Sequence, residues 1–121
     1  MTRSIMPRPK KKIIARFYKT SNDTEPVRNW LLKLSIEDRK IVGKDIQKVE
    51  FGWPIGMPYS RPLGRGLFEV RCDISDKRIA RVIFLIKNDE MVLLHGFVKK
   101  SQKTSKADLD LAINRKKEIE Q

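Results

Sequence analysis

The chain has 121 residues, 40% of them apolar, and carries 27 lysines and arginines against 15 aspartates and glutamates, a formal net charge of +12. This size and apolar content predict one folded domain over residues 1–121 and exclude wholesale disorder, and no apolar run approaches the roughly 20 residues that cross a bilayer. The charge favours an acidic partner (nucleic acid, a ribosome, an anionic membrane surface or an acidic protein), and the single cysteine, Cys72, excludes an internal disulfide and indicates a reducing cytoplasm.

The chain begins with a predicted basic tail and a strand. Residues 1–11 are basic and contain no apolar segment, which indicates a mobile tail and no secretory signal. Residues 13–18 form an apolar and aromatic run that is typical of a strand.

Two helices are predicted next. After a turn at residues 21–24, apolar side chains recur at helical spacing behind Pro26. Ser35 is the expected cap of a second helix, with Asp38 three residues later. The inner face of that helix is predicted to hold Val42, Ile46 and Val49. We interpret the pair as an antiparallel helical hairpin that covers a sheet.

Glycines and prolines between residues 52 and 66 then interrupt all periodicity, which predicts a long connection without regular structure. Such a connection is typical of a functional loop, and Arg61 and Arg65 within it suit RNA or a partner protein. The alternative is an ordered loop that packs Trp53 and Met57 against the edge of the core.

Three apolar segments follow and predict antiparallel strands joined by short turns. In residues 67–74 every second side chain is apolar, and Glu69, Arg71 and Asp73 lie on the other face. Residues 79–86 are apolar on both faces apart from Arg81, which indicates a central strand.

Residues 91–98 show the same two-sided apolar pattern as residues 79–86. Ser105 is the expected cap of a last helix, with Asp108 three residues later, and the apolar positions of this helix include Ala107, Leu111 and Ile119. Together these elements predict a domain of the α+β class.

Cations on the open side of this sheet are the candidates for chemistry. Arg71 and Arg81 lie on neighbouring strands, and Lys99, Lys100 and Lys103 follow the last strand. Arginine suits an RNA phosphate because its fork matches the phosphate oxygens, whereas crowded lysines favour the neutral amine that can accept a proton. One histidine and one cysteine cannot build a zinc cluster, so we expect no metal and no cofactor.

Structural explanations compete with these roles. Glu69 shares a face with Arg71, so an ion pair with Arg71 or Arg81 would account for a charge in an apolar strand. The lysine cluster would also serve as a solvated surface. His95, the only histidine, is expected to share a strand face with Leu93 and suits a packed, partly buried position better than a catalytic one.

Three motifs resemble the RelE/HigB superfamily of bacterial toxins: GLFEVR at residues 66–71, RIARVIF at 78–84 and LHGFVKK at 94–100. Extended to Thr104, the last motif is similar to the phage-derived Gp49-like branch, as is the Pro-Leu-Gly loop at 62–64. The resemblance implies the RelE-like fold: an N-terminal strand, a helical hairpin, a curved antiparallel sheet of three further strands and a C-terminal helix.

The resemblance also implies an activity and partners. It implies a toxin of a type II toxin–antitoxin system, which contacts ribosomal RNA and cleaves mRNA on the ribosome as an endoribonuclease. Its partner would be a helix-turn-helix antitoxin, through which the toxin would reach operator DNA indirectly. The alternatives are a non-enzymatic module that binds nucleic acid or protein with its basic face, and an inactive phage-derived relative.

Site residues are carried over by motif. The implied catalytic residues are Arg71, Arg81, Lys99 and Lys100, with Arg81 at a phosphate-stabilising position. The residues assigned to RNA binding are Arg61, Arg65, His95, Lys103 and Lys106. The chain departs from many relatives in one respect, because no aromatic residue follows Phe97, whereas those relatives carry a tyrosine or histidine near the C-terminus.

Overall fold

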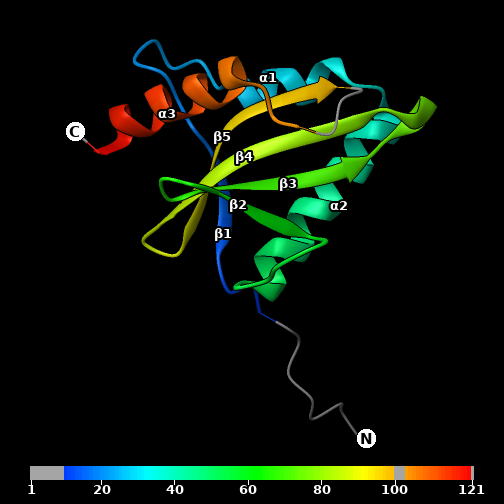
Figure 1. Ribbon diagram of the computed structural model, residues 1–121, viewed down its shortest axis with the longest axis horizontal. Helices are drawn as coiled ribbons and strands as arrows, with labels where there is room; N and C mark the ends of the chain where they lie inside the picture. Colours follow the sequence, from blue (N-terminus) through cyan, green and yellow to red (C-terminus); the bar gives the residue numbers. More distant parts are fainter. Residues whose placement is uncertain (1–9, 100–102, 121) are drawn as a thin grey trace, which may run out of the picture.

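The computed structural model describes residues 10–99 and 103–120 (Figure 1). Along this part of the chain the elements are β1 (Ile14–Phe17), α1 (Pro26–Lys33), α2 (Ile36–Gly52), β2 (Ser60–Gly64), β3 (Leu67–Asp73), a short 3₁₀ turn (Ser75–Lys77), β4 (Ile79–Lys87), β5 (Glu90–Lys99) and α3 (Lys106–Glu120). Of the predicted tail, residues 1–9 lie outside the described residues. Lys11 is anchored to α2, because its Nζ lies 3.1 Å from Glu50 Oε1.

The strands form one five-stranded sheet in the order β1-β5-β4-β3-β2. β1 runs parallel to β5, and the other neighbours are antiparallel, so the sheet is mixed. The prediction of three strands after the helices is wrong by one, because β2 lies in the segment predicted to lack regular structure. Pro62 and Gly64 hide its periodicity, and both residues are tolerated there because β2 is an edge strand.

The segment before β2 partly follows the ordered-loop alternative. The Trp53 ring packs edge-on against Phe68, with ring centres 4.9 Å apart, and also contacts Phe84. Met57 is exposed, so the expectation that it packs into the core is wrong. The indole of Trp53 is large enough to close this edge of the core alone.

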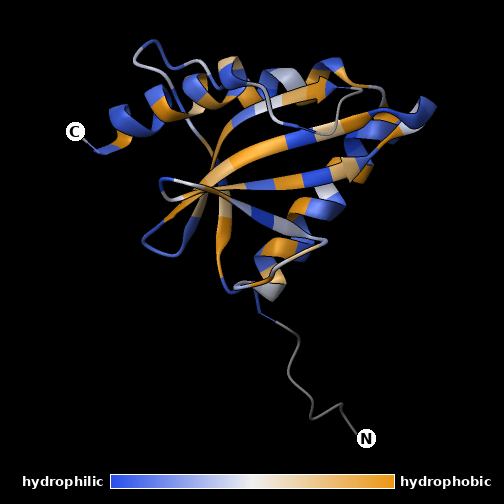
Figure 2. Ribbon diagram, viewed as in Figure 1, coloured by the Kyte–Doolittle hydropathy of each residue, from blue (hydrophilic) through white to orange (hydrophobic). Residues whose placement is uncertain are grey.

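β4 is the central strand, as predicted from its two-sided apolar pattern. Its residues from Ile79 to Leu85 are all buried. Figure 2 shows the middle strands as largely hydrophobic and the turns as hydrophilic. The turns on either side of β4 use left-handed residues, Asp76 and Lys77 before it and Asn88 and Asp89 after it.

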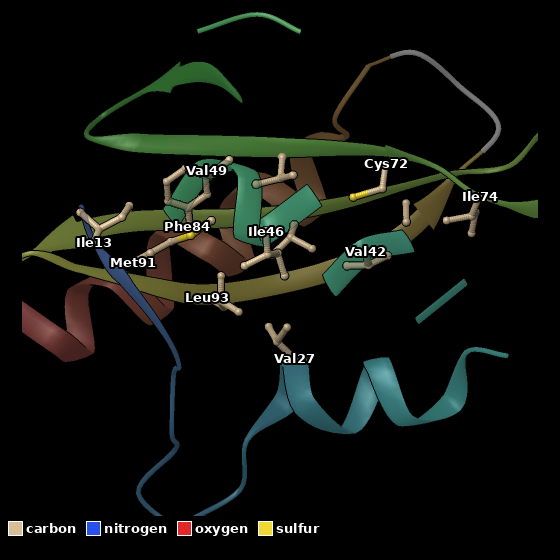
Figure 3. Packing of buried hydrophobic residues seen from close by; sticks show 13 residues of the cluster. Ile13, Val27, Val42, Ile46, Val49, Cys72, Ile74, Phe84, Met91 and Leu93 are labelled. Carbon is tan, nitrogen blue, oxygen red and sulfur yellow. The ribbon is translucent and has the colours of Figure 1, made fainter. Parts of the chain in front are cut away.

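α1 and α2 cover one face of the sheet, as predicted (Figure 3). The inward residues Val42, Ile46 and Val49 are buried against the strands. The predicted cap is also confirmed, because the Asp38 backbone N–H donates to Ser35 Oγ at 3.1 Å. The hairpin is tied by Arg39, whose guanidinium donates to backbone carbonyls at the end of α1.

α3 covers the opposite face, where Tyr18, Leu67, Ile83 and Leu94 meet it. Its predicted cap is confirmed, because the backbone N–H of residue 108 donates to Ser105 Oγ at 3.1 Å. The predicted inner positions are only partly right: Ile119 packs against this cluster, whereas Ala107 and Leu111 are exposed and Ala112 is the buried residue. No helix in the described ranges is long and apolar enough to cross a bilayer.

A β-bulge in β5 decides which way its side chains point. Ile83 pairs with His95 and Phe84 with Leu93, so Leu94 is an extra residue on β5. Leu93 therefore faces α1 and α2, whereas His95 faces α3. The expectation that these two residues share a face is wrong, because the bulge reverses the alternation.

The glycine after His95 lets α1 approach the sheet closely. A Cβ atom at Gly96 would lie 2.3 Å from Cε3 of Trp30, far inside any real contact. The Trp30 ring thus occupies the place of the missing side chain. The glycine of the HGF motif is required by packing, on the face opposite His95.

Candidate functional site

Glu69 on β3 is the centre of a hydrogen-bond network on the α3 face of the sheet. Its Oε1 accepts from Arg81 Nη1 on β4 and, at 3.2 Å, from Arg61 Nη2 on β2. Its Oε2 accepts from the Thr104 hydroxyl, which precedes α3. Strand pairing brings these groups together, because Arg61 lies opposite Glu69 in the β2–β3 register.

The Glu69–Arg81 ion pair is buried. The exposed fractions of the two side chains are 1% and 2%. The structural explanation weighed for Arg81 is thus observed: an ion pair with Glu69 accounts for the charge in an apolar strand. In this arrangement Arg81 supports the carboxylate that holds Arg61. Contacts with a molecule bound at the surface are left to other residues.

A cavity of about 180 Å³ opens beside this network. Its lining consists of Met57, Pro58, Ser60, Arg61, Glu69, Arg71 and Arg81. Arg71 is 44% exposed, and its Nη2 lies 3.7 Å from Asp73 Oδ1, too far for a direct hydrogen bond. Three arginines and one carboxylate line the cavity and leave it positive, which suits an anion such as a phosphate.

Asp108, in the first turn of α3, is the centre of a second network. Its Oδ1 lies 2.7 Å from His95 Nε2, and its Oδ2 lies 2.8 Å from Lys99 Nζ. The Ser105 hydroxyl donates to Oδ2 at 2.6 Å. Burial raises the pKa of Asp108, but the hydrogen bonds from Lys99, Ser105 and His95 outweigh burial and hold its pKa at about 2.

His95 is held neutral and oriented by its neighbours. Its ring stacks on Phe97 with centres 5.2 Å apart. Burial lowers the pKa of His95, and the Asp108 carboxylate offsets only part of that effect. A neutral imidazole beside a carboxylate donates from the near nitrogen, so we assign the proton to Nε2. Nδ1 then keeps a lone pair that can accept a proton.

The two networks are neighbours. Thr104, which binds Glu69, is followed directly by Ser105, which binds Asp108. Across the sheet, Ile83 pairs with both Glu69 and His95, so these two residues lie about 10 Å apart at the usual strand spacing. One nucleotide could therefore reach both networks.

The remaining predicted site residues are placed as follows. Lys100 lies outside the described residues. Arg65, Lys103 and Lys106 are exposed and do not line the cavity. Arg65 has a left-handed backbone in the β2–β3 turn, and its carbonyl accepts from Lys116 on α3. The structure thus gathers Arg61, Arg71 and Arg81 at the cavity beside one network, and His95 and Lys99 at the other network.

Sequence reasoning identified Asp108 only as a helix-capping residue and passed over the Thr104 side chain. The pattern Thr-Ser-x-x-Asp before α3 signals a cap, which accounts for one bond of Asp108. Its bonds to His95 and Lys99 depend on how α3 packs over β5. No local signal in the sequence marks them.

The imidazole of His95 will titrate below its usual pKa of 6.5 in the folded protein, because burial disfavours the charged ring. The chain has one histidine, so its NMR signals can be followed without ambiguity. Asp108→Asn will lower the pKa further, because it removes the anion that favours the charged ring. A midpoint at or above 6.5 in the wild-type protein would contradict the buried position.

The free energy of unfolding will depend on pH through the same titration of His95. As the pH decreases through about 6.5, the unfolded chain binds a proton before the folded chain does, so the free energy of unfolding decreases. His95→Gln removes this group and should flatten the pH dependence in that window, measured by urea denaturation at a series of pH values. An unchanged slope would mean that His95 has the same pKa in both states.

Comparison with known protein families gives a match over residues 29–117, to the family described as "Phage derived protein Gp49-like (DUF891)". A comparison with curated proteins finds no match. The matched region runs from α1 into α3 and includes both networks. The RelE/HigB superfamily is the known context of this family, which is associated with toxin–antitoxin modules. Because the match spans most of its length, the chain belongs to the phage-derived Gp49-like protein family.

Proposed function

We propose that this protein is the toxin of a type II toxin–antitoxin pair and cleaves mRNA as a ribosome-dependent endoribonuclease. One observation carries the proposal: an anion-sized cavity lined by three arginines and a single carboxylate, with two of the arginines bound to that carboxylate. Membership of a family associated with toxin–antitoxin modules supports it. The formal charge of +12 favours close approach to RNA.

Arg71 makes the first contact with the RNA in this proposal. Its guanidinium is partly exposed at the cavity and can bind two phosphate oxygens at once. Arg61 adds a second cation at the same cavity, with its Nη2 fixed by Glu69. Arg81 is a positioning residue, because it acts on the phosphate site through Glu69.

The proton transfers fall to the second network. The 2′-hydroxyl gives its proton to His95 Nδ1 while its oxygen forms a bond to phosphorus. The bond from phosphorus to the 5′-oxygen breaks, and the Lys99 ammonium protonates that oxygen. The products are a 2′,3′-cyclic phosphate and a 5′-hydroxyl. His95 thus takes the place of the aromatic group near the C-terminus that this chain lacks.

The ribosome supplies positioning in this proposal. Holding the ribose and phosphate in line for attack can contribute several orders of magnitude to the rate. Lys103 and Lys106 lie on the exposed surface, where they can contact RNA beyond the scissile bond, and we propose the same role for Arg65. A helix-turn-helix antitoxin would neutralise the toxin and link it to operator DNA.

Arg71→Ala should reduce mRNA cleavage by roughly 10²- to 10³-fold, because a cation at the reacting phosphate acts where charge develops. The measurement is a reconstituted translation reaction with mapping of mRNA ends. Arg28→Ala is the matched control, since Arg28 is an exposed arginine on α1, which covers the other face of the sheet. It should leave cleavage unchanged.

Two outcomes would overturn this proposal in different ways. Full cleavage by a folded Arg71→Ala variant would remove the cavity from the reaction. If the intact protein binds RNA in a salt-dependent way but leaves translated mRNA whole, the chain is a non-enzymatic binding module.

A further inference from the structure

An open groove lies on α2 and the segment that follows it, outside both networks. Its volume is about 590 Å³, and its lining consists of Lys44, Gln47, Lys48, Phe51, Gly52, Ile55 and Tyr59. We call it the α2 groove. Five of these residues belong to α2, at positions i, i+3, i+4, i+7 and i+8 counted from Lys44, so they form one helix face. The inward face of α2 is separate, at Val42, Ile46 and Val49.

Apolar surface is exposed in the α2 groove. Phe51 is 40% exposed and Tyr59 is 42% exposed, and Ile55 lines the groove with them. Met57, on the same segment, is also exposed. Neighbouring aromatic and aliphatic side chains that stay in contact with water are characteristic of interaction sites.

The charges of the α2 groove favour an acidic occupant. Both charged residues that line it are lysines, Lys44 and Lys48. The Lys48 ammonium lies 5.8 Å from the centre of the Tyr59 ring, at the boundary of the apolar floor. An apolar floor with a cationic rim fits a segment that carries apolar side chains on one side and carboxylates on the other.

A protein segment fits this surface better than RNA does. A neighbouring cavity of about 280 Å³ shares Lys48 and Tyr59 with the groove and also contains Arg71. Asp45 and Asp73 line that cavity, so carboxylates stand between the α2 groove and the arginines of the proposed active site. These carboxylates offset the charges of Lys48 and Arg71 in that cavity, so an RNA backbone that continued from one surface to the other would gain no attraction there.

We propose that the α2 groove binds an acidic, amphipathic helix of a partner protein. This deepens the proposed function, because it locates the partner that a toxin requires. The segment between α2 and β2 links the two surfaces: Ile55 and Tyr59 line the groove, whereas Met57 and Pro58 line the phosphate cavity. A helix that displaces this segment would therefore also move a wall of that cavity.

The test uses the full chain and a synthetic helical peptide with leucines on one face and glutamates on the other. Its affinity is measured by fluorescence anisotropy, and its contacts are mapped by NMR shifts of the chain. We expect shifts at residues 44–59. Lys44→Glu should weaken binding at least roughly tenfold, because it places a like charge at the rim. Lys117→Glu is the control, an exposed lysine on α3, which covers the opposite face of the sheet, and it should change affinity by less than about twofold.

Each remaining outcome would overturn the inference. An acidic helix would be excluded here if the peptide does not bind or if the NMR shifts lie elsewhere on the chain. Equal binding of a peptide with lysine in place of glutamate would exclude it as well. Shifts at residues 44–59 that depend on protein concentration alone would assign the groove to a second copy. Tighter binding of a uridine-rich RNA at the same residues would assign it to RNA. No ribosome is used, so these results are independent of whether the protein cleaves mRNA.

Discussion

Glu69→Gln will destabilise the folded protein by about 3–5 kcal/mol, the usual cost of removing one partner of a buried ion pair. The substitution keeps the shape of the side chain but removes the negative charge that the buried Arg81 guanidinium contacts. The free energy of unfolding should be measured by urea denaturation. Glu37→Gln is the control, because Glu37 is an exposed residue in the first turn of α2, and it should cost less than about 1 kcal/mol.

A double variant separates the structural role of this pair from its proposed role in the site. Glu69→Leu with Arg81→Met replaces both charges by apolar groups and should be more stable than Glu69→Leu alone. It should nevertheless cleave poorly, because Arg61 loses the carboxylate that positions it. A loss of less than about 1 kcal/mol in Glu69→Gln would show that water reaches the pair.

Gly96→Ala will destabilise the fold by about 3 kcal/mol or more, near the upper limit of overpacking effects. The new Cβ would lie 2.3 Å, 2.6 Å and 2.8 Å from three ring atoms of Trp30, so α1 would have to move away from β5. A decrease in stability would be informative, because alanine in a strand is otherwise more favourable than glycine. Thermal and urea unfolding would both report the loss.

Two comparisons make this prediction specific. Gly43→Ala, in the middle of α2, places a Cβ where nothing lies within 4 Å, and it should stabilise the fold by about 0.5–1 kcal/mol. In a Trp30→Leu background, Gly96→Ala should cost much less than in the wild type, because the colliding ring atoms are gone. An equal cost in both backgrounds would place the strain elsewhere.

Most elements could be predicted from the sequence because their signals are local. Ser35 and Ser105 mark helix starts, and the uninterrupted apolar run of β4 marks a central strand. β2 could not be predicted in this way, since its only strand signal is its pairing with β3 across the turn at Arg65. The parallel pairing of β1 with β5 likewise depends on segments far apart in the chain.

The site was predictable in its composition but not in its arrangement. Alternation along β3 placed Glu69 and Arg71 on one face, and the cost of a charge in β4 pointed to an ion pair for Arg81. The sequence gives no sign of the bulge at Leu94, because a run that is apolar on both faces looks the same before and after a change of register. The direction of His95, and therefore its bond to Asp108, could only be read from the fold.

The pairing of β1 with β5 affects how the protein folds while it is being synthesised. Ile14 on β1 pairs with Glu90 on β5, 76 residues later in the chain. Thr104, which binds Glu69, and Asp108, which binds His95, are translated later still. Contacts this distant in sequence form slowly and only when both segments are present. A nascent chain therefore exposes the edge of β1 until β5 has been made, and His95 gains its partner Asp108 only after that.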